Sequence, residues 1–276
     1  INEFILLGFS YGLQVQILLY LVFLVTYTVT VTEKAVTIFV VKTNHHLQKP
    51  MCYFLGNLLF LEIWYVSLTL PGLLFGFWSQ SMTISFSSCM TQLYFFISLM
   101  CTECVFLAVM AYDCYLAVCH PLRYPAITTH KLCFQLSILS WAGGFSISLV
   151  KASFISCLTF CGQQVMNHFF CDFSPVLNLS CTDMSLAEAV DFALALVILL
   201  VSLLIIVFSY CCILSTILCM PSDQGRRKAF SICTSHFTVV VIFFSTTLFI
   251  CAKPRRIHPF NLNKIVSVFY AVFTPA

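Results

Sequence analysis

The chain has very few charged side chains. Of its 276 residues only 8 % are Asp, Glu, Lys or Arg, whereas 61 % are hydrophobic. Average soluble domains contain roughly 25 % charged residues, and a water-soluble fold of this size cannot bury so much apolar surface. The composition therefore excludes a soluble globular protein and predicts that lipid surrounds most of the chain. The net charge of +3 says little about partners, and we expect no nucleic acid among them.

Sequence motifs of enzymes and transporters are also missing. The chain has no His-Glu-x-x-His, Gly-x-Ser-x-Gly or Gly-Asp protease motif, so we expect no enzyme, no cofactor and no metal site. A transporter should show two related halves with helices interrupted near the midplane, and no such repeat occurs. No basic segment precedes the first apolar run, which argues against a cleaved signal peptide. The chain starts without Met and stops inside an apolar segment, as a fragment would.

Seven apolar runs organise the chain. Six are long enough to cross ~30 Å of hydrocarbon, which takes about 20 helical residues, and the seventh is truncated after 15 residues at the end of the sequence. We therefore predict an all-α membrane protein in which one domain, residues 1–276, forms a seven-transmembrane helix bundle. The predicted helices are 15–41, 51–72, 89–119, 132–155, 186–219, 229–251 and 262–276.

Lysine and arginine predict how the bundle is oriented. The first loop, 42–49, holds two of them, the second loop none, and the third loop Arg123 and Lys131. Basic loops stay on the cytoplasmic side, so the amino end is predicted to be extracellular. The run 226–228 in the fifth loop agrees, whereas Lys253 and its neighbours in the sixth loop do not.

Four cysteines are predicted to lie on the outer side. The long loop 156–185 carries Cys161, Cys171 and Cys181, and Cys89 begins the third helix. An oxidising exterior favours disulfides among them, although four cysteines allow three pairings that the sequence does not resolve. The same loop carries a glycosylation sequon at Asn178. Most of the other cysteines of the chain lie in apolar runs, where a thiol behaves as a small hydrophobe.

Six motifs follow one another along the chain. They are Glu3–Phe9, Leu47–Met51, Met110–Tyr124, Ser209–Tyr210, Lys228–His236 and Lys264–Tyr270. In this order they resemble the vertebrate odorant receptors, a branch of the rhodopsin-like G-protein-coupled receptors, over nearly the whole chain. The resemblance implies a multi-pass plasma-membrane receptor that binds small, mostly neutral volatile molecules. It also implies activation of the olfactory stimulatory heterotrimeric G protein and cAMP signalling.

The resemblance assigns roles to particular residues. It implies the disulfides Cys89–Cys171 and Cys161–Cys181, which would make the outer loop a lid over the bundle. It also implies a set of switch and G-protein residues at the inner face. These are Asp113, Cys114, Tyr115, Leu122, Tyr210, Arg226, Lys228 and His236. For the basic residues, an orientation signal alone is the alternative. His236 has no His or carboxylate at i+4, so we do not expect it to bind a metal.

The chain departs from the family pattern at several positions. Cys114 stands where the family has an Arg that is a pivot of activation, Lys34 where it has Asn, and Cys251 where a Tyr is common. The Asn-Pro-containing end of the seventh helix is missing. A non-signalling or coupling-impaired relic is therefore the main alternative to a working receptor, and a transporter is a remote one.

Three ionisable residues lie deep in the predicted spans: Lys34, Glu62 and Glu103. A charge at the bilayer centre costs about 2.5–3.5 kcal/mol on insertion scales, so these residues should face the bundle interior. The resemblance implies an acidic pair that can hold a sodium ion. We hypothesise that the Lys34 ammonium replaces this ion and bridges Glu62 and Glu103. The alternative is that Lys34 extends toward the inner interface while a protonated Glu62 makes a local hydrogen bond.

Two stripes at helical spacing suggest a ligand pocket, since they mix small, weakly polar groups with large apolar ones. Plain helix packing is the alternative. The stripes, with two residues of the fifth helix, comprise Ile97, Met100, Cys101, Cys104, Leu194, Ile198, Phe244, Thr247, Leu248 and Cys251. By resemblance these positions line the odorant cavity. Because we find no acid in its outer half, we expect neutral ligands rather than cationic amines. The minor alternative is that Lys253 and Arg255, at the mouth of the pocket, bind an acid group of the ligand.

Overall fold

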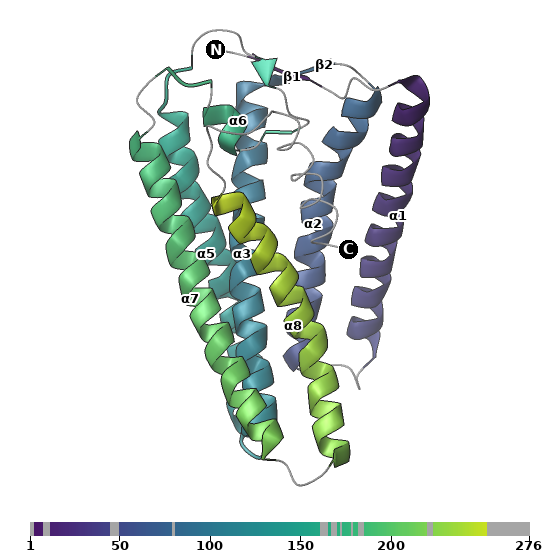
Figure 1. Cartoon of the computed structure of the whole chain (residues 1–276), viewed down its shortest axis with the longest axis vertical. Helices are drawn as coiled ribbons and strands as arrows, with labels where there is room; N and C mark the ends of the chain where they lie inside the picture. Colours follow the sequence, from purple (N-terminus) through teal and green to yellow (C-terminus); the bar gives the residue numbers. More distant parts are fainter. Residues whose placement is uncertain are drawn as a thin grey trace.

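The computed structural model describes residues 3–7, 12–44, 50–78, 81–160, 165–166, 170–171, 173–177, 179–181, 185–219 and 223–252. Within these ranges five helices are long and apolar enough to cross a membrane, and a sixth contains the apolar stretch Cys233–Leu248. The six long helices run side by side as a bundle (Figure 1). They are α1 (Leu13–Thr43), α2 (Pro50–Trp78), α3 (Phe86–Cys119), α5 (His130–Ser156), α7 (Ser185–Leu218) and α8 (Asp223–Ala252).

The predicted helix bounds differ from the observed ones mainly at the membrane surfaces. Helix α2 was predicted to end at Gly72 but continues to Trp78, with Pro71 inside it, because the residues that follow are apolar and remain helical in lipid. Helix α8 begins at Asp223, before the predicted start at Ala229, since its exposed first turns extend beyond the apolar stretch into water. The predicted seventh helix, 262–276, lies outside the described residues.

Helix α3 is the central element of the bundle. It packs against α2, α5, α7 and α8, and it lies between α2 and α7 in Figure 1. Side chains all along its length, such as Leu93, Leu99 and Phe106, are completely buried. Helix α1, in contrast, packs on α2 at the edge of the bundle. A residue on α3 is therefore well placed to sense changes in several other helices.

The outer end of the bundle carries a small sheet that the sequence analysis did not predict. Strand β1 (Glu3–Leu7) pairs antiparallel with β2 (Ser81–Ser85) and parallel with β3 (Val165–Met166). The ring of Phe4 on β1 is fully buried and packs against Phe86 and Phe160, with 5.9 Å between ring centroids in each pair. The amino-terminal segment thus joins two outer loops into one layer.

A disulfide holds this outer layer to α3. Cys89 is bonded to Cys171, as the family resemblance implied. The Gln92 side chain, one turn further along α3, accepts a hydrogen bond from the backbone N–H of Cys171 (3.1 Å) and donates one to the carbonyl of Leu68 (3.3 Å). Cys181 is also in a disulfide, while its expected partner Cys161 and the sequon residue Asn178 lie outside the described residues. Short helices α4 (Tyr124–Ile127) and α6 (Phe173–Leu177) complete the described elements.

Helices α3 and α5 approach closely at Gly144. A Cβ atom added there would fall on Thr102 Oγ1 and lie 2.9 Å from both the Ser98 carbonyl oxygen and the Thr102 backbone nitrogen. Only a glycine lets the two backbones come this close. The neighbouring Gly143 has no atom within 4 Å of a Cβ added there, so it offers a matched control.

We predict that Gly144→Ala destabilises the bundle by about 1–3 kcal/mol, because the added methyl overpacks the contact between α3 and α5. The melting temperature of the purified protein and its amount at the cell surface should both fall, whereas Gly143→Ala should leave them close to wild type. Equal behaviour of the two variants would show that this contact does not set the helix spacing.

Candidate functional site

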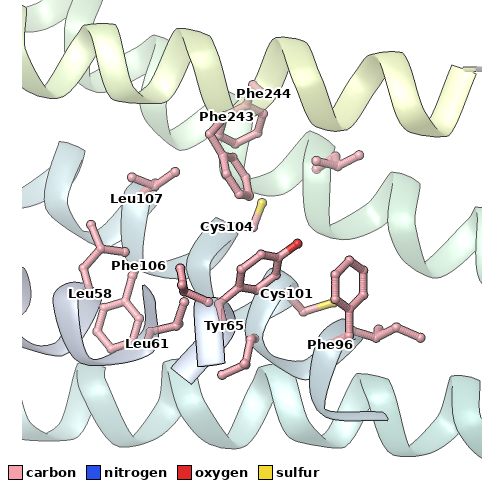
Figure 2. Close-up of a cluster of buried hydrophobic side chains, with 14 of the residues drawn as sticks. Leu58, Leu61, Tyr65, Phe96, Cys101, Cys104, Phe106, Leu107, Phe243 and Phe244 are labelled. Carbon is pink, nitrogen blue, oxygen red and sulfur yellow. The ribbon is translucent and has the colours of Figure 1, made fainter. Parts of the chain in front are cut away.

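A small cavity lies between four helices in the outer half of the bundle. Its volume in this structure is about 20 Å³, which is room for roughly one water molecule. Its lining comes from α3, α5, α7 and α8, and comprises Met100, Cys101, Cys104, Lys151, Ala195, Ile198, Leu199, Phe243 and Thr247. Figure 2 shows Phe243 extending from α8 toward Cys104 of α3, with Tyr65 of α2 nearby. A larger ligand can enter only if such side chains move apart.

The cavity includes half of the residues predicted for the pocket. Met100, Cys101, Cys104, Ile198 and Thr247 line it. Two further predicted residues, Ile97 and Phe244, are buried beside it without lining it.

The other predicted pocket residues lie elsewhere. Leu194 is half-buried and its neighbour Ala195 lines the cavity instead. The prediction was wrong for Leu248, which is 46 % exposed on the outside of α8, because the face of α8 that meets the cavity is the one carrying Phe243 and Thr247. The side chain of Cys251 lies outside the described residues.

One of the residues that line the cavity belongs to an ion pair that the sequence analysis missed. Lys151 of α5 lines the cavity, is only 4 % exposed, and its ammonium nitrogen lies 3.0 Å from Asp191 Oδ1 of α7. We expected no acid in the outer half of the pocket. Asp191 is not among the residues that line the cavity, but it pairs with a lysine that does. Asp191 lies near the start of α7, where it resembles a solvated helix end in the sequence. A lysine inside the predicted span 132–155 was the signal that could have revealed the pair.

A second ion pair joins α1 to α2 deeper in the bundle. The Lys34 ammonium lies 2.6 Å from Glu62 Oε2, and both side chains are largely buried. The expected second arm of this bridge is absent: Glu103 is buried, but no ion pair within 4.0 Å joins it to Lys34 in the described structure. Helix α1 packs on α2 at the edge of the bundle, whereas Glu103 belongs to the central helix. The Lys34 ammonium therefore forms an ion pair with Glu62 and not with Glu103.

The inner end of α3 is tied to the loop that follows it. The Tyr124 hydroxyl donates to both oxygens of the buried Asp113 carboxylate, at 3.1 and 3.2 Å. Burial, followed by the negative charge of Asp113, raises the pKa of Tyr124 above its ordinary value, so this hydroxyl keeps its proton at neutral pH. Cys114, in the position where the family has Arg, is buried. Tyr124 thus supplies a hydrogen bond to the acid that precedes the missing Arg.

A buried hydrogen bond connects the inner halves of α7 and α8. The Tyr210 hydroxyl lies 2.5 Å from His236 Nδ1, while His236 Nε2 is buried with no hydrogen-bond partner among the described residues. Nearer the end of α3, the Tyr115 hydroxyl lies 3.1 Å from His120 Nε2. Of the other predicted inner-face residues, Leu122 is 95 % exposed and Arg226 is exposed. The side chain of Lys228 lies outside the described residues.

This arrangement defines a class of protein. Apolar helices cross the membrane, a disulfide-held layer covers one end, and a cavity beneath that layer is walled by helices whose opposite ends are linked by polar contacts. A molecule entering the cavity can thus influence the far side of the membrane, which is what a multi-pass plasma-membrane receptor requires.

Comparison with known proteins gives the family. A model of the olfactory receptor family matches residues 23–276. The chain is 60 % identical to human olfactory receptor 6B1 and 55 % identical to mouse olfactory receptor 6B9; each alignment covers the whole chain and 88 % or 87 % of the relative. Human olfactory receptor 6A2 is 51 % identical, with 85 % of its length covered. The chain belongs to the olfactory receptor family, and its function is that of a signalling odorant receptor.

We predict that Lys34→Met lowers the stability of the receptor by about 3 kcal/mol, because it leaves the Glu62 carboxylate buried without its counter-ion. The melting temperature of the purified receptor should fall, and the double variant Lys34→Met/Glu62→Gln should recover most of the loss. Lys131→Met, at the exposed start of α5, is the control. If Lys34→Met melts at the same temperature as the wild type and reaches the cell surface equally well, the ion pair does not stabilise the receptor.

Proposed function

We propose that the receptor binds small, mostly neutral volatile molecules in the cavity between α3, α5, α7 and α8. The observation that carries this proposal is the cavity itself, which lies inside the bundle and has a mainly apolar lining. Removing apolar surface from water contributes roughly 25 cal/mol per Å², so even a small odorant gains affinity there. Met100 lines the cavity, and its unbranched side chain is suited to adapt to different ligand shapes.

Helix α8 provides a route from the ligand to the inner face. Its Phe243 and Thr247 line the cavity, and two turns closer to its start His236 contacts Tyr210 of α7. A ligand that binds more tightly to one arrangement of α8 shifts the population of receptors toward that arrangement. Tyr210 and His236 are, on this proposal, part of the switch, together with Asp113, Cys114 and Tyr115 at the end of α3.

The partner inside the cell is, in this proposal, the stimulatory heterotrimeric G protein of the olfactory type, which raises cAMP. Leu122 lies three residues after the end of α3 and is almost completely exposed, as an apolar side chain that packs into the core of an interface would be before the partner binds. The hydrogen bonds from Tyr124 to Asp113 hold this loop against α3. Arg226 and Lys228, at the start of α8, would add positive charge to the same side.

Cys114 does not by itself argue for a relic, because the Asp113 carboxylate keeps a hydrogen-bond donor in Tyr124. The identity of 60 % over the whole chain to a curated receptor also favours a working protein. We propose no sodium ion as a cofactor, since the Lys34 ammonium already supplies positive charge to Glu62.

The proposal predicts that cells expressing the wild-type receptor raise cAMP in response to members of a volatile odorant panel. Cys114→Arg should increase the maximal response, because it restores the family's activation pivot, without changing which odorants act. A wild-type receptor that reaches the cell surface and stays silent across the panel would contradict the proposal, even if Cys114→Arg responds.

The docking surface has its own test. We predict that Leu122→Ala lowers the maximal cAMP response severalfold while leaving odorant binding and surface expression unchanged, because it removes an apolar contact to the G protein. Leu204→Ala is the matched control, since Leu204 is an exposed leucine in the middle of α7. If both variants signal like wild type, Leu122 does not contact the G protein.

A further inference from the structure

The cavity has two polar groups that a purely apolar ligand would not need. Lys151 is the one charged residue among the described residues that line it. Thr247 lines it as well, and its buried Oγ1 atom has no hydrogen-bond partner in the described part of the chain. A buried polar atom without a partner costs free energy, so its presence at this position requires an explanation.

The ion pair fixes the position and charge of the lysine. Lys151 Nζ lies 3.0 Å from Asp191 Oδ1, and an ammonium carries three N–H donors in different directions. One carboxylate oxygen therefore leaves donors for a second acceptor on the cavity side. The Asp191 charge also offsets the charge of Lys151, so the cavity presents a strong hydrogen-bond donor with little net positive charge.

We propose that Lys151 and Thr247 anchor the oxygen atom of the ligand, and that this receptor therefore selects neutral molecules with a hydrogen-bond-accepting oxygen, such as a ketone or ester, on an apolar skeleton. The ligand oxygen accepts from the Lys151 ammonium and from the Thr247 hydroxyl, and the skeleton packs against Met100, Ile198 and Phe243. Asp191 sets the charge preference, because it repels a carboxylate that would approach the same ammonium. The proposal deepens the proposed function and rests on odorant binding in this cavity.

Binding and signalling are measured separately in the test. Straight-chain alkanes, ketones and carboxylic acids of matched carbon number are added to the purified full-length receptor, and the concentration that raises its melting temperature is recorded. The same compounds are then assayed for cAMP in cells. Ketones should act on the wild type at concentrations at least about tenfold lower than the matched alkanes, as a hydrogen bond to a charged donor predicts.

Three variants separate the two anchors from the charge effect. Thr247→Val keeps the shape of the side chain and removes an unpaired hydroxyl, so it should fold normally and weaken ketone binding severalfold while alkane binding stays the same. Lys151→Met/Asp191→Leu removes both charges together, which avoids a buried unpaired carboxylate, and should make ketones and alkanes equally weak. Asp191→Asn should shift the preference from ketones toward the matched acids.

Three results would contradict the proposed anchoring of the ligand oxygen. Alkanes that bind as well as ketones, a Thr247→Val receptor with unchanged ketone binding, or a wild-type receptor that no compound stabilises would each overturn the inference. Ketone-selective stabilisation without any cAMP response would support the anchor and contradict the proposed signalling function instead. Leu248→Ala, one residue from Thr247 but exposed on the outer side of α8, should match wild type throughout.

Discussion

Hydrocarbon offers no hydrogen-bond partner to a polar group, and this constraint shapes the whole bundle. Several hydroxyl groups in the spans bond within their own helix: Ser98 donates to the carbonyl of Tyr94, Thr102 to that of Ser98, and Ser148 to that of Gly144. Small residues of this kind, together with Gly144 itself, let α3 and α5 approach closely. Charged residues cannot satisfy themselves locally, so they pair across helices, as Lys34 does with Glu62 and Lys151 with Asp191. Ion pairs therefore help to hold α1 next to α2 and α5 next to α7.

Helix α3 is held by neighbouring segments at both ends of the receptor. At the outer end the Cys89–Cys171 bond and Gln92 hold the covering layer to α3, and at the inner end Tyr124 is bonded to Asp113 on the same helix. Helix α3 is thus fixed at both ends. Helix α8 lines the cavity with Phe243 and Thr247, and its His236 contacts Tyr210 of α7. Against a fixed α3, a change in how α8 packs is the simplest way for an odorant to alter the inner face.

Much of this architecture could be predicted from the sequence, because a span of about 20 apolar residues has few alternatives in lipid. The disulfide and the inward-facing Lys34 and Glu62 followed from family resemblance and from the cost of charge in hydrocarbon. Helix rotation could not be predicted: an i, i+3, i+4 stripe identifies a face but not its neighbour, which is why Leu248 was misplaced and Phe243 missed. Lys151 was overlooked because its partner Asp191 resembles a helix end, and β1 because it is a short strand that pairs only with distant loops.

The central claim is that odorants bind in the cavity between α3, α5, α7 and α8, and the chain carries its own reporters for it. Cys101 and Cys104 line the cavity, whereas Cys157 and Cys211 are exposed elsewhere. The most direct measurement is the rate at which a small neutral thiol reagent labels each cysteine of the purified receptor, resolved by peptide mass spectrometry, with and without an activating odorant. The account predicts slower labelling of Cys101 and Cys104 and unchanged labelling of Cys157 and Cys211. An activating odorant that leaves Cys101 and Cys104 as reactive as before would contradict it.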